Sequence, residues 1–183
     1  MCRMTGLVLL LLLPAQVSAD AVKGLYVGSD FYAPGDSVQN AARISGFNRL
    51  FLSFLHVDAE GNLTYNNTPV VQNGVYVGDP AWGIKLAALK APPTDIKRIE
   101  LAIGGDQNEA SFANIKRLIA AQGTDADSIL HKDFLALKNA TGVDAIQFID
   151  EKTYDVPSVV AFGNMLAGLG LNVTLRPYAN QSF

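Results

Sequence analysis

Two adjacent carboxylates, Asp150 and Glu151, are the residues of this chain best placed to do chemistry. They follow an apolar run over residues 143–149, which is typical of a parallel strand buried on both faces. Folds of the α/β class place their ligands at the carboxyl ends of such strands, and a carboxyl group there can transfer a proton. The sequence therefore predicts a site at this strand end, with Glu151 and Asp150 as the candidate catalytic residues.

Strand and helix signals alternate along the chain and would position this site. Such alternation predicts parallel βα units joined by right-handed crossovers. The predicted strands span residues 23–28, 49–57, 96–103, 143–149 and 172–178. The predicted helices begin near residues 36, 79, 108, 124 and 156, and a long loop rich in Asn, Gly and Pro spans residues 58–80.

Five βα units could form an open doubly wound α/β sheet or part of a parallel (β/α) barrel of the TIM type. The complete barrel typically needs about 250 residues, more than the 183 of this chain. An open sheet would leave its last strand uncovered, because no closing helix follows residues 172–178. We therefore expect an incomplete barrel of about five units, one domain over residues 20–183, whose open edge could support self-association.

The first 19 residues have the pattern of a secretory signal peptide. Arg3 precedes an apolar run from Leu7 to Leu13, and a small-residue cleavage site ends at Ala19. The run is shorter than the roughly 20 residues of a membrane-spanning helix, so we expect a secreted or periplasmic protein with no membrane anchor. The only cysteine, Cys2, lies inside this signal, so no internal disulfide is expected.

The charge balance argues against a nucleic-acid partner and favours a neutral or weakly polar ligand. The formal net charge is −3, and no basic cluster offers a footprint for phosphates. His56 and His131 lie far apart with no Cys/His cluster, so no zinc site is expected. Cofactor motifs such as the P-loop and G-x-G-x-x-G are missing from the sequence, and no cofactor is expected.

Two segments together resemble the paired signatures of the family 18 glycoside hydrolases, which include chitinases, endo-N-acetylglucosaminidases and chitinase-like lectins. Residues 101–105 (L-A-I-G-G) are similar to the family's S-x-G-G pattern on its third strand. Residues 144–151 (D-A-I-Q-F-I-D-E) are similar to D-G-x-D-x-D-x-E on its fourth strand. The resemblance covers most of the mature chain and implies a TIM barrel that holds glycans at its carboxyl-end mouth.

The resemblance also implies roles for single residues. Glu151 matches the Glu that protonates the glycosidic oxygen in the family, and Asp144 matches the first Asp. Gln147 and Ile149 stand where the family has its middle and last Asp. In the family the last Asp orients the substrate's acetamide, whose oxygen attacks the sugar in place of an enzyme carboxylate. Isoleucine can neither accept a hydrogen bond nor supply negative charge, so hydrolysis is expected to be impaired.

Strand alternation decides which side chains can face the barrel lumen. Gln147, Ile149 and Glu151 share one face, and Asp150 lies on the other. Only a bulge at the strand end would turn Asp150 inward. Glu151 keeps three interpretations: a general acid, a hydrogen-bonding group for a ligand, or the structural partner of a cation such as Arg176, which would keep the carboxylate ionised.

Glycine and aromatic residues complete the candidate site. Glycines allow a tight turn and a close approach to the backbone, and aromatic faces stack on sugar rings, although core packing is an equally open role for the aromatic residues. The candidate substrate-binding residues are Gln147, Asp144, Gly104, Gly105, Tyr26, Trp82 and Tyr178.

We therefore expect a secreted protein that binds N-acetylglucosamine-containing oligosaccharides and in which hydrolysis is doubtful. One alternative is an active glycoside hydrolase that uses Glu151 as its general acid. The other is a non-functional barrel fragment. A lectin would leave a bound chito-oligosaccharide unchanged, whereas an enzyme would cleave it.

Overall fold

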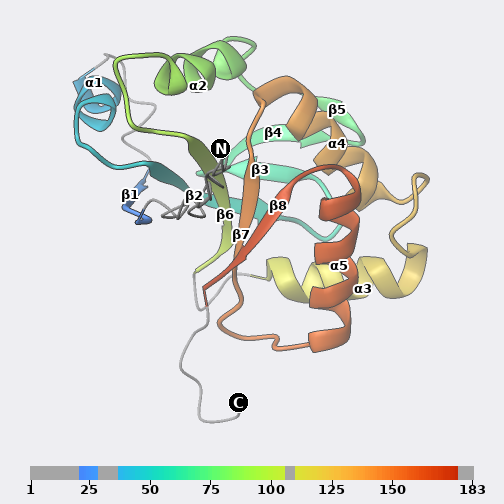
Figure 1. Cartoon of the computed structure of the whole chain (residues 1–183). Helices are drawn as coiled ribbons and strands as arrows, with labels where there is room; N and C mark the ends of the chain where they lie inside the picture. Colours follow the sequence, from blue (N-terminus) through green and yellow to red (C-terminus); the bar gives the residue numbers. More distant parts are fainter. Residues whose placement is uncertain (1–20, 29–36, 106–109, 177–183) are drawn as a thin grey trace, which may run out of the picture.

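Five parallel strands form the centre of the protein, seen in a computed structural model that describes residues 21–28, 37–105 and 110–176 (Figure 1). The strands lie side by side in the order β1-β2-β6-β7-β8. Their bounds are β1 (Gly24–Val27), β2 (Arg49–Val57), β6 (Arg98–Gly104), β7 (Ala145–Ile149) and β8 (Asn172–Leu175). The five predicted strands and their parallel pairing are thus confirmed.

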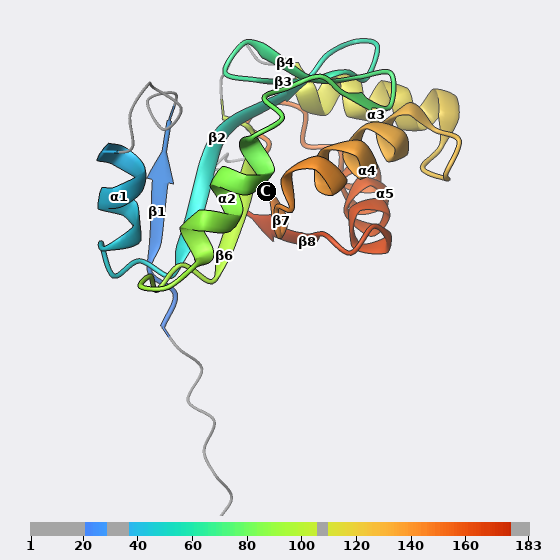
Figure 2. The same cartoon turned by 90° about the horizontal axis from the view of Figure 1, so that it is seen from above.

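Helices connect the parallel strands and cover one face of the sheet (Figures 1 and 2). Their bounds are α1 (Ser37–Arg43), α2 (Trp82–Lys90), α3 (Ser111–Gln122), α4 (Ile129–Thr141) and α5 (Val156–Gly168). Helix α4 begins later than the sequence predicted, at Ile129 instead of near residue 124. The hydroxyl of Ser128 accepts a hydrogen bond from the backbone N–H of His131 at 3.4 Å and caps the helix there.

The predicted long loop over residues 58–80 is wrong, because it contains an antiparallel meander. Its strands are β3 (Leu63–Tyr65), β4 (Thr68–Gln72) and β5 (Val75–Tyr76), and β3 pairs with the last residues of β2. The Asn and Gly residues that suggested a loop form its two tight turns. Asn66 and Asn67 have φ values of 47° and 63°, and Asn73 and Gly74 have 50° and 78°. Hairpin turns need such left-handed pairs.

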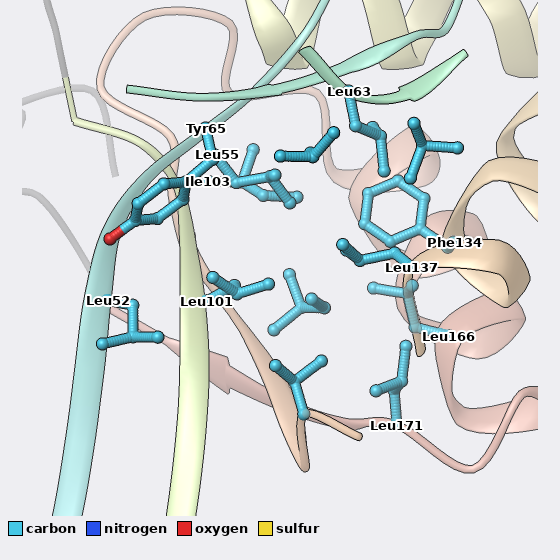
Figure 3. Packing of buried hydrophobic residues seen from close by; sticks show 14 of the residues in the cluster. Leu52, Leu55, Leu63, Tyr65, Leu101, Ile103, Phe134, Leu137, Leu166 and Leu171 are labelled. Atoms are coloured by element: carbon cyan, nitrogen blue, oxygen red, sulfur yellow. The ribbon is translucent and has the colours of Figure 1, made fainter. Parts of the chain in front are cut away.

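The main apolar core lies between the sheet and the helices (Figure 3). Leu101 and Ile103 of β6 are fully buried on the face toward α4, where Phe134 and Leu137 are also fully buried. Phe148 of β7 joins this core through the rings of Phe112 and Phe162, with centroid distances of 5.6 and 5.2 Å. Alternate residues of the same strands therefore face the helices.

The opposite face of the sheet carries polar side chains. Arg49 of β2 and Arg98 of β6 both contact Glu100, with nitrogen–oxygen distances of 3.3 and 3.0 Å. Arg98 also donates a hydrogen bond to the Thr174 hydroxyl of β8 at 3.1 Å. Such interior-facing layers of side chains are typical of the lumen of a (β/α) barrel. We call this polar side the lumen face.

The sheet does not close into a complete barrel over the described ranges, where β1 pairs with β2 and β8 with β7. This arrangement confirms the α/β class and the incomplete barrel. No helix in the described part of the chain is long and apolar enough to cross a membrane. The signal sequence lies outside the described residues, so it remains a prediction.

Candidate functional site

The glycine doublet and the two carboxylates lie at the same end of the sheet, the lower end in Figure 1. Gly104 of β6 pairs in register with Ile149 of β7, and the N–H of Gly105 donates to the Ile149 carbonyl at 3.1 Å. A Cβ at Gly104 would lie 2.3 Å from that same carbonyl oxygen. Both glycines also have a positive φ, 84° and 89°. Only glycine fits this doublet, which brings the end of β6 against the start of the Asp150–Glu151 segment.

Glu151 is half-buried, and its carboxylate has neither a hydrogen bond nor an ion pair with any residue that the structure describes. The guanidinium of Arg176 lies over the ring of Tyr26, 5.4 Å from its centroid, and forms no ion pair with Glu151. The interpretation of Glu151 as the structural partner of Arg176 is therefore not supported by a contact between the two side chains. The general-acid role and the ligand-binding role both remain predictions.

Asp150 faces its own loop. One of its carboxylate oxygens accepts the N–H groups of Lys152 and Thr153 at 3.1 and 2.8 Å, and the other accepts the N–H of Tyr154 at 2.8 Å. Tyr154 has a φ of 47°, so this carboxylate supports a left-handed turn between β7 and α5. A catalytic role for Asp150 remains a prediction, although backbone donors already occupy both of its oxygens.

The turn leads directly into α5, whose start is fixed by Asp155. Its side chain accepts the N–H of Ser158 at 3.1 Å, as an N-cap does. Lys116 of α3 forms an ion pair with the same carboxylate at 2.8 Å. The hydrogen bond from Lys116, followed by those from Ser158, lowers the pKa of Asp155 below its ordinary value. Helices α3 and α5 are thereby tied together beside the loop that carries Glu151.

Gln147 and Tyr26 meet on the lumen face. The Tyr26 hydroxyl donates a hydrogen bond to Gln147 Oε1 at 2.7 Å, joining β1 to β7. Gln147 is 3% exposed, whereas Tyr26 is 45% exposed. The ring of Tyr26 stacks on Phe51 of β2, with a centroid distance of 4.5 Å and an interplanar angle of 14°. The predicted lumen-facing orientation of Gln147 is thus confirmed, since Phe148 beside it points into the core.

Asp144 lies at the opposite, amino end of β7. Its carboxylate accepts the N–H of Ile99 at 2.8 Å and contacts Lys90 Nζ at 2.9 and 3.0 Å. It therefore joins the end of α2 to the starts of β6 and β7. The structure does not bring Asp144 to Glu151, and its predicted substrate contact has no geometric support.

The three candidate aromatic residues have different positions. Trp82 is 3% exposed and packs in the core against Tyr65, with ring centroids 5.2 Å apart. Its ring is therefore covered by protein, which is the core-packing alternative. Tyr178 lies outside the described residues. Of the two that the structure describes, Tyr26 lies at the lumen face with an exposed surface.

Phe51 completes this cluster, and sequence reasoning missed it. Arg49, Phe51 and Ser53 alternate with apolar residues along β2, so the period of two marked the lumen face of this strand. The register between β1 and β2, which places Tyr26 opposite Phe51, was the missing information. Among the described residues, no group of three or more His, Cys, Asp or Glu side chains could hold a metal ion.

Solved structures share this fold. The GH18 chitinase ChiB of Flavobacterium johnsoniae matches with a TM-score of 0.56 and 16% identity, over 88% of this chain and 50% of that chain. The chain has the fold of the family 18 glycoside hydrolases. A Cycas revoluta GH18 chitinase variant in complex with (GlcNAc)4 matches with a TM-score of 0.52 and 14% identity, over 81% of this chain and 39% of that chain. The chitinase-like agglutinin RobpsCRA of Robinia pseudoacacia matches with a TM-score of 0.50 and 19% identity, over 81% of this chain and 40% of that chain.

These matches confirm the resemblance at the level of the fold. The family 18 fold is present in part, because the chain spans half or less of the length of these neighbours. No family model and no curated protein matches the chain. The same fold thus occurs in a chitinase and in an agglutinin, and the fold alone does not choose between hydrolysis and binding.

Proposed function

We propose that this protein binds N-acetylglucosamine-containing oligosaccharides at the carboxyl-end mouth of its sheet and leaves them uncleaved. The observation that carries the proposal is the half-buried Glu151 carboxylate, which has no partner among the described residues. It follows Ile149, which pairs with Gly104 at the carboxyl end of β7, the strand that carries the lumen-facing Gln147 bonded to Tyr26. A ligand hydroxyl or amide would give this carboxylate the hydrogen bond that the protein does not provide.

The surroundings of Glu151 support binding over hydrolysis. Ile149, two residues before it, is 2% exposed and carries no group that could orient an acetamide or offset a positive charge. Asp150 has both oxygens engaged by backbone N–H groups of its own loop. A transition-state interaction of this kind is worth several kcal/mol, about 10²–10³ in rate. Glu151 alone would therefore give weak catalysis at most.

The glycoside hydrolase alternative keeps one supporting observation. Arg176 does not contact Glu151, so no ion pair with this arginine occupies the carboxylate. A proton donor at this position is therefore compatible with the geometry. The alternative differs from the proposal in a single measurable property, the release of shorter sugars.

Isothermal titration with chitotetraose, followed by mass spectrometry of the recovered ligand, tests the proposal. We expect saturable binding and intact ligand after prolonged incubation. Glu151→Gln should weaken binding about ten- to a hundredfold, because a hydrogen bond to a charged group contributes roughly 1.5–3 kcal/mol. The matched control is Glu60→Gln, an exposed glutamate in the turn between β2 and β3, which should bind as the wild type does.

Each remaining outcome is decisive. Release of shorter sugars that disappears in Glu151→Gln would replace the binding proposal with the hydrolase alternative. If folded wild-type protein shows no saturable binding, the alternative of a non-functional barrel fragment is favoured. Equal affinities of the wild type and Glu151→Gln would remove Glu151 from the site.

A further inference from the structure

We propose that the mouth of the sheet selects glycans that carry a carboxylate, and that Arg176 is the residue that recognises it. This inference rests on the proposed function and names the class of ligand. A uronic acid residue beside N-acetylglucosamine is the simplest glycan of this class. The argument follows from the position, the orientation and the charge of Arg176.

Backbone pairing places Arg176 beside Ile149, the residue that stands where the family 18 signature has its last Asp. Phe148 pairs with Leu175, and the N–H of Arg176 donates to the Phe148 carbonyl at 3.0 Å. One residue further along each strand, Arg176 lies next to Ile149. Because strand side chains alternate, both point to the lumen face together with Gln147 and Thr174. An apolar residue and a cation thus adjoin where the family 18 pattern has a carboxylate.

The arginine side chain is held in place by the aromatic cluster. Its guanidinium lies 5.4 Å from the centroid of the Tyr26 ring. Tyr26 in turn is fixed by its hydrogen bond to Gln147 and by its stacking on Phe51. Cation–π contacts of this kind contribute roughly 0.5–1 kcal/mol at exposed sites. The guanidinium is therefore oriented before any ligand arrives, which lowers the entropic cost of binding.

The charge of Arg176 is not neutralised within the described part of the chain. The other two arginines of the lumen face, Arg49 and Arg98, share the buried carboxylate of Glu100. Arg176 is exposed, and no carboxylate of a described residue lies in ion-pair contact with it. Its planar fork of N–H donors matches the two oxygens of a carboxylate.

The neighbouring buried amide supports Arg176 indirectly. Gln147, 3% exposed, accepts the Tyr26 hydroxyl through Oε1 and so holds the ring over which Arg176 lies. Arginine provides donors and no acceptor. The lumen face at the carboxyl ends of β7 and β8 therefore complements an acceptor-rich, anionic substituent, and Glu151 remains as the acceptor for sugar hydroxyls. Ile149 stands where the family signature has an acid, and Arg176 lies beside it. The missing negative charge disfavours a positively charged transition state, and the adjacent cation favours a negatively charged ligand.

Titration with two matched tetrasaccharides tests this assignment. One is the hyaluronan tetrasaccharide, which alternates N-acetylglucosamine with glucuronic acid, and the other is the same molecule with its carboxyl groups reduced. We expect the acidic form to bind about tenfold more tightly, with a preference that shrinks as salt rises. Arg176→Gln should abolish the preference and leave the affinity for the reduced form unchanged.

Two further variants separate recognition from structural support. Arg176→Lys keeps the charge without the planar fork, so it should retain a smaller, salt-sensitive preference even if the glutamine variant unfolds. Arg43→Gln, at the end of α1, changes a half-buried arginine away from the mouth, whose guanidinium donates to the Ala91 and Pro92 carbonyls. It should leave the preference unchanged.

Equal binding of the two tetrasaccharides would overturn the inference, as would a preference that persists in Arg176→Gln. Binding of the reduced form or of chitotetraose without any preference would leave the proposed glycan-binding function standing. If neither these sugars nor chitotetraose binds, the proposed function itself fails.

Discussion

Three carboxylates within one eight-residue signature have three different environments. Asp144 is held by Lys90 and the N–H of Ile99, and Asp150 by three N–H groups of its loop. Glu151 has no such partner among the described residues. Residue type therefore does not identify the functional acid in this protein. The hydrogen-bond partners of each carboxylate separate Glu151 from the other two, because an acid already satisfied by protein donors has little to offer a ligand.

A fourth carboxylate, Asp133, predicts how stability depends on pH. It is fully buried between α4 and the β4–β5 turn, where the Gly74 N–H donates to it. Burial is the main cause that raises its pKa from 3.8 to about 6, with the charge of Asp58 adding to the rise. The folded state thus binds a proton more tightly than the unfolded chain. The stability that this proton confers is complete below pH 4 and is lost as the pH rises to about 6.

Asp133→Asn should remove this dependence. We expect the free energy of unfolding of the variant, relative to wild type, to increase by up to about 2 kcal/mol between pH 4 and pH 6. Urea unfolding at a series of pH values measures it. The control is Asp127→Asn, which changes an exposed carboxylate just before α4. The difference in free energy of unfolding between this variant and the wild type should be the same at pH 4 and pH 6. If the difference in free energy of unfolding between Asp133→Asn and the wild type is also the same at both pH values, the prediction is contradicted.

At the scale of elements, helix α2 packs against α4 through a glycine. A Cβ at Gly83 would lie 2.4 Å from the Ala140 carbonyl oxygen of α4. This close approach keeps α2 near the sheet, with Trp82 and Leu86 buried in the core. Helix propensity alone would favour alanine at Gly83, so the glycine is explained by the contact between the two helices.

Gly83→Ala should therefore lower the free energy of unfolding by about 1–2 kcal/mol, because the overpacking cost exceeds the propensity gain of about 1 kcal/mol. Gly168→Ala is the matched control in α5, where nothing lies within 4 Å of the added Cβ. It should raise stability by up to about 1 kcal/mol. Urea denaturation of both variants gives the comparison, and destabilisation of equal size in the two would refute the packing argument.

At the scale of the whole molecule, one open edge of the sheet adjoins an apolar groove. The groove has a volume of about 570 Å³ and runs between α5 and β8, with Val160 and Leu175 54% and 63% exposed. Large apolar side chains beside the last strand of the described sheet, which has a partner strand on one side only, favour association. We propose self-association of two copies through this edge.

Light scattering after size exclusion should show a mass that rises with protein concentration. Val160→Glu should reduce this rise, because burying a carboxylate in the groove is costly. The control, Ile84→Glu, changes a residue of α2 that is 75% exposed and lies outside the groove, and should leave the mass unchanged. A wild-type mass that stays monomeric at all concentrations would exclude self-association.

Local patterns in the sequence determined the five parallel strands, the lumen-facing side of β7 and the glycine doublet at the end of β6. These depend on strand alternation and turn chemistry over a few neighbouring residues. The same local patterns misjudged the meander in residues 58–80, where Asn-rich turns resembled a loop. The resemblance to the family signature grouped Asp144 with Glu151, although the two lie at opposite ends of the strand.

Only the tertiary structure decided which residues form the site. Tyr26 and Gln147 are 121 positions apart and meet because the register of four strands aligns them. The burial of Trp82 against Tyr65 and the contact of Arg176 with Tyr26 depend in the same way on packing between distant elements. Periodicity shows which face a side chain takes, whereas its partner follows from how the strands and helices are arranged in space.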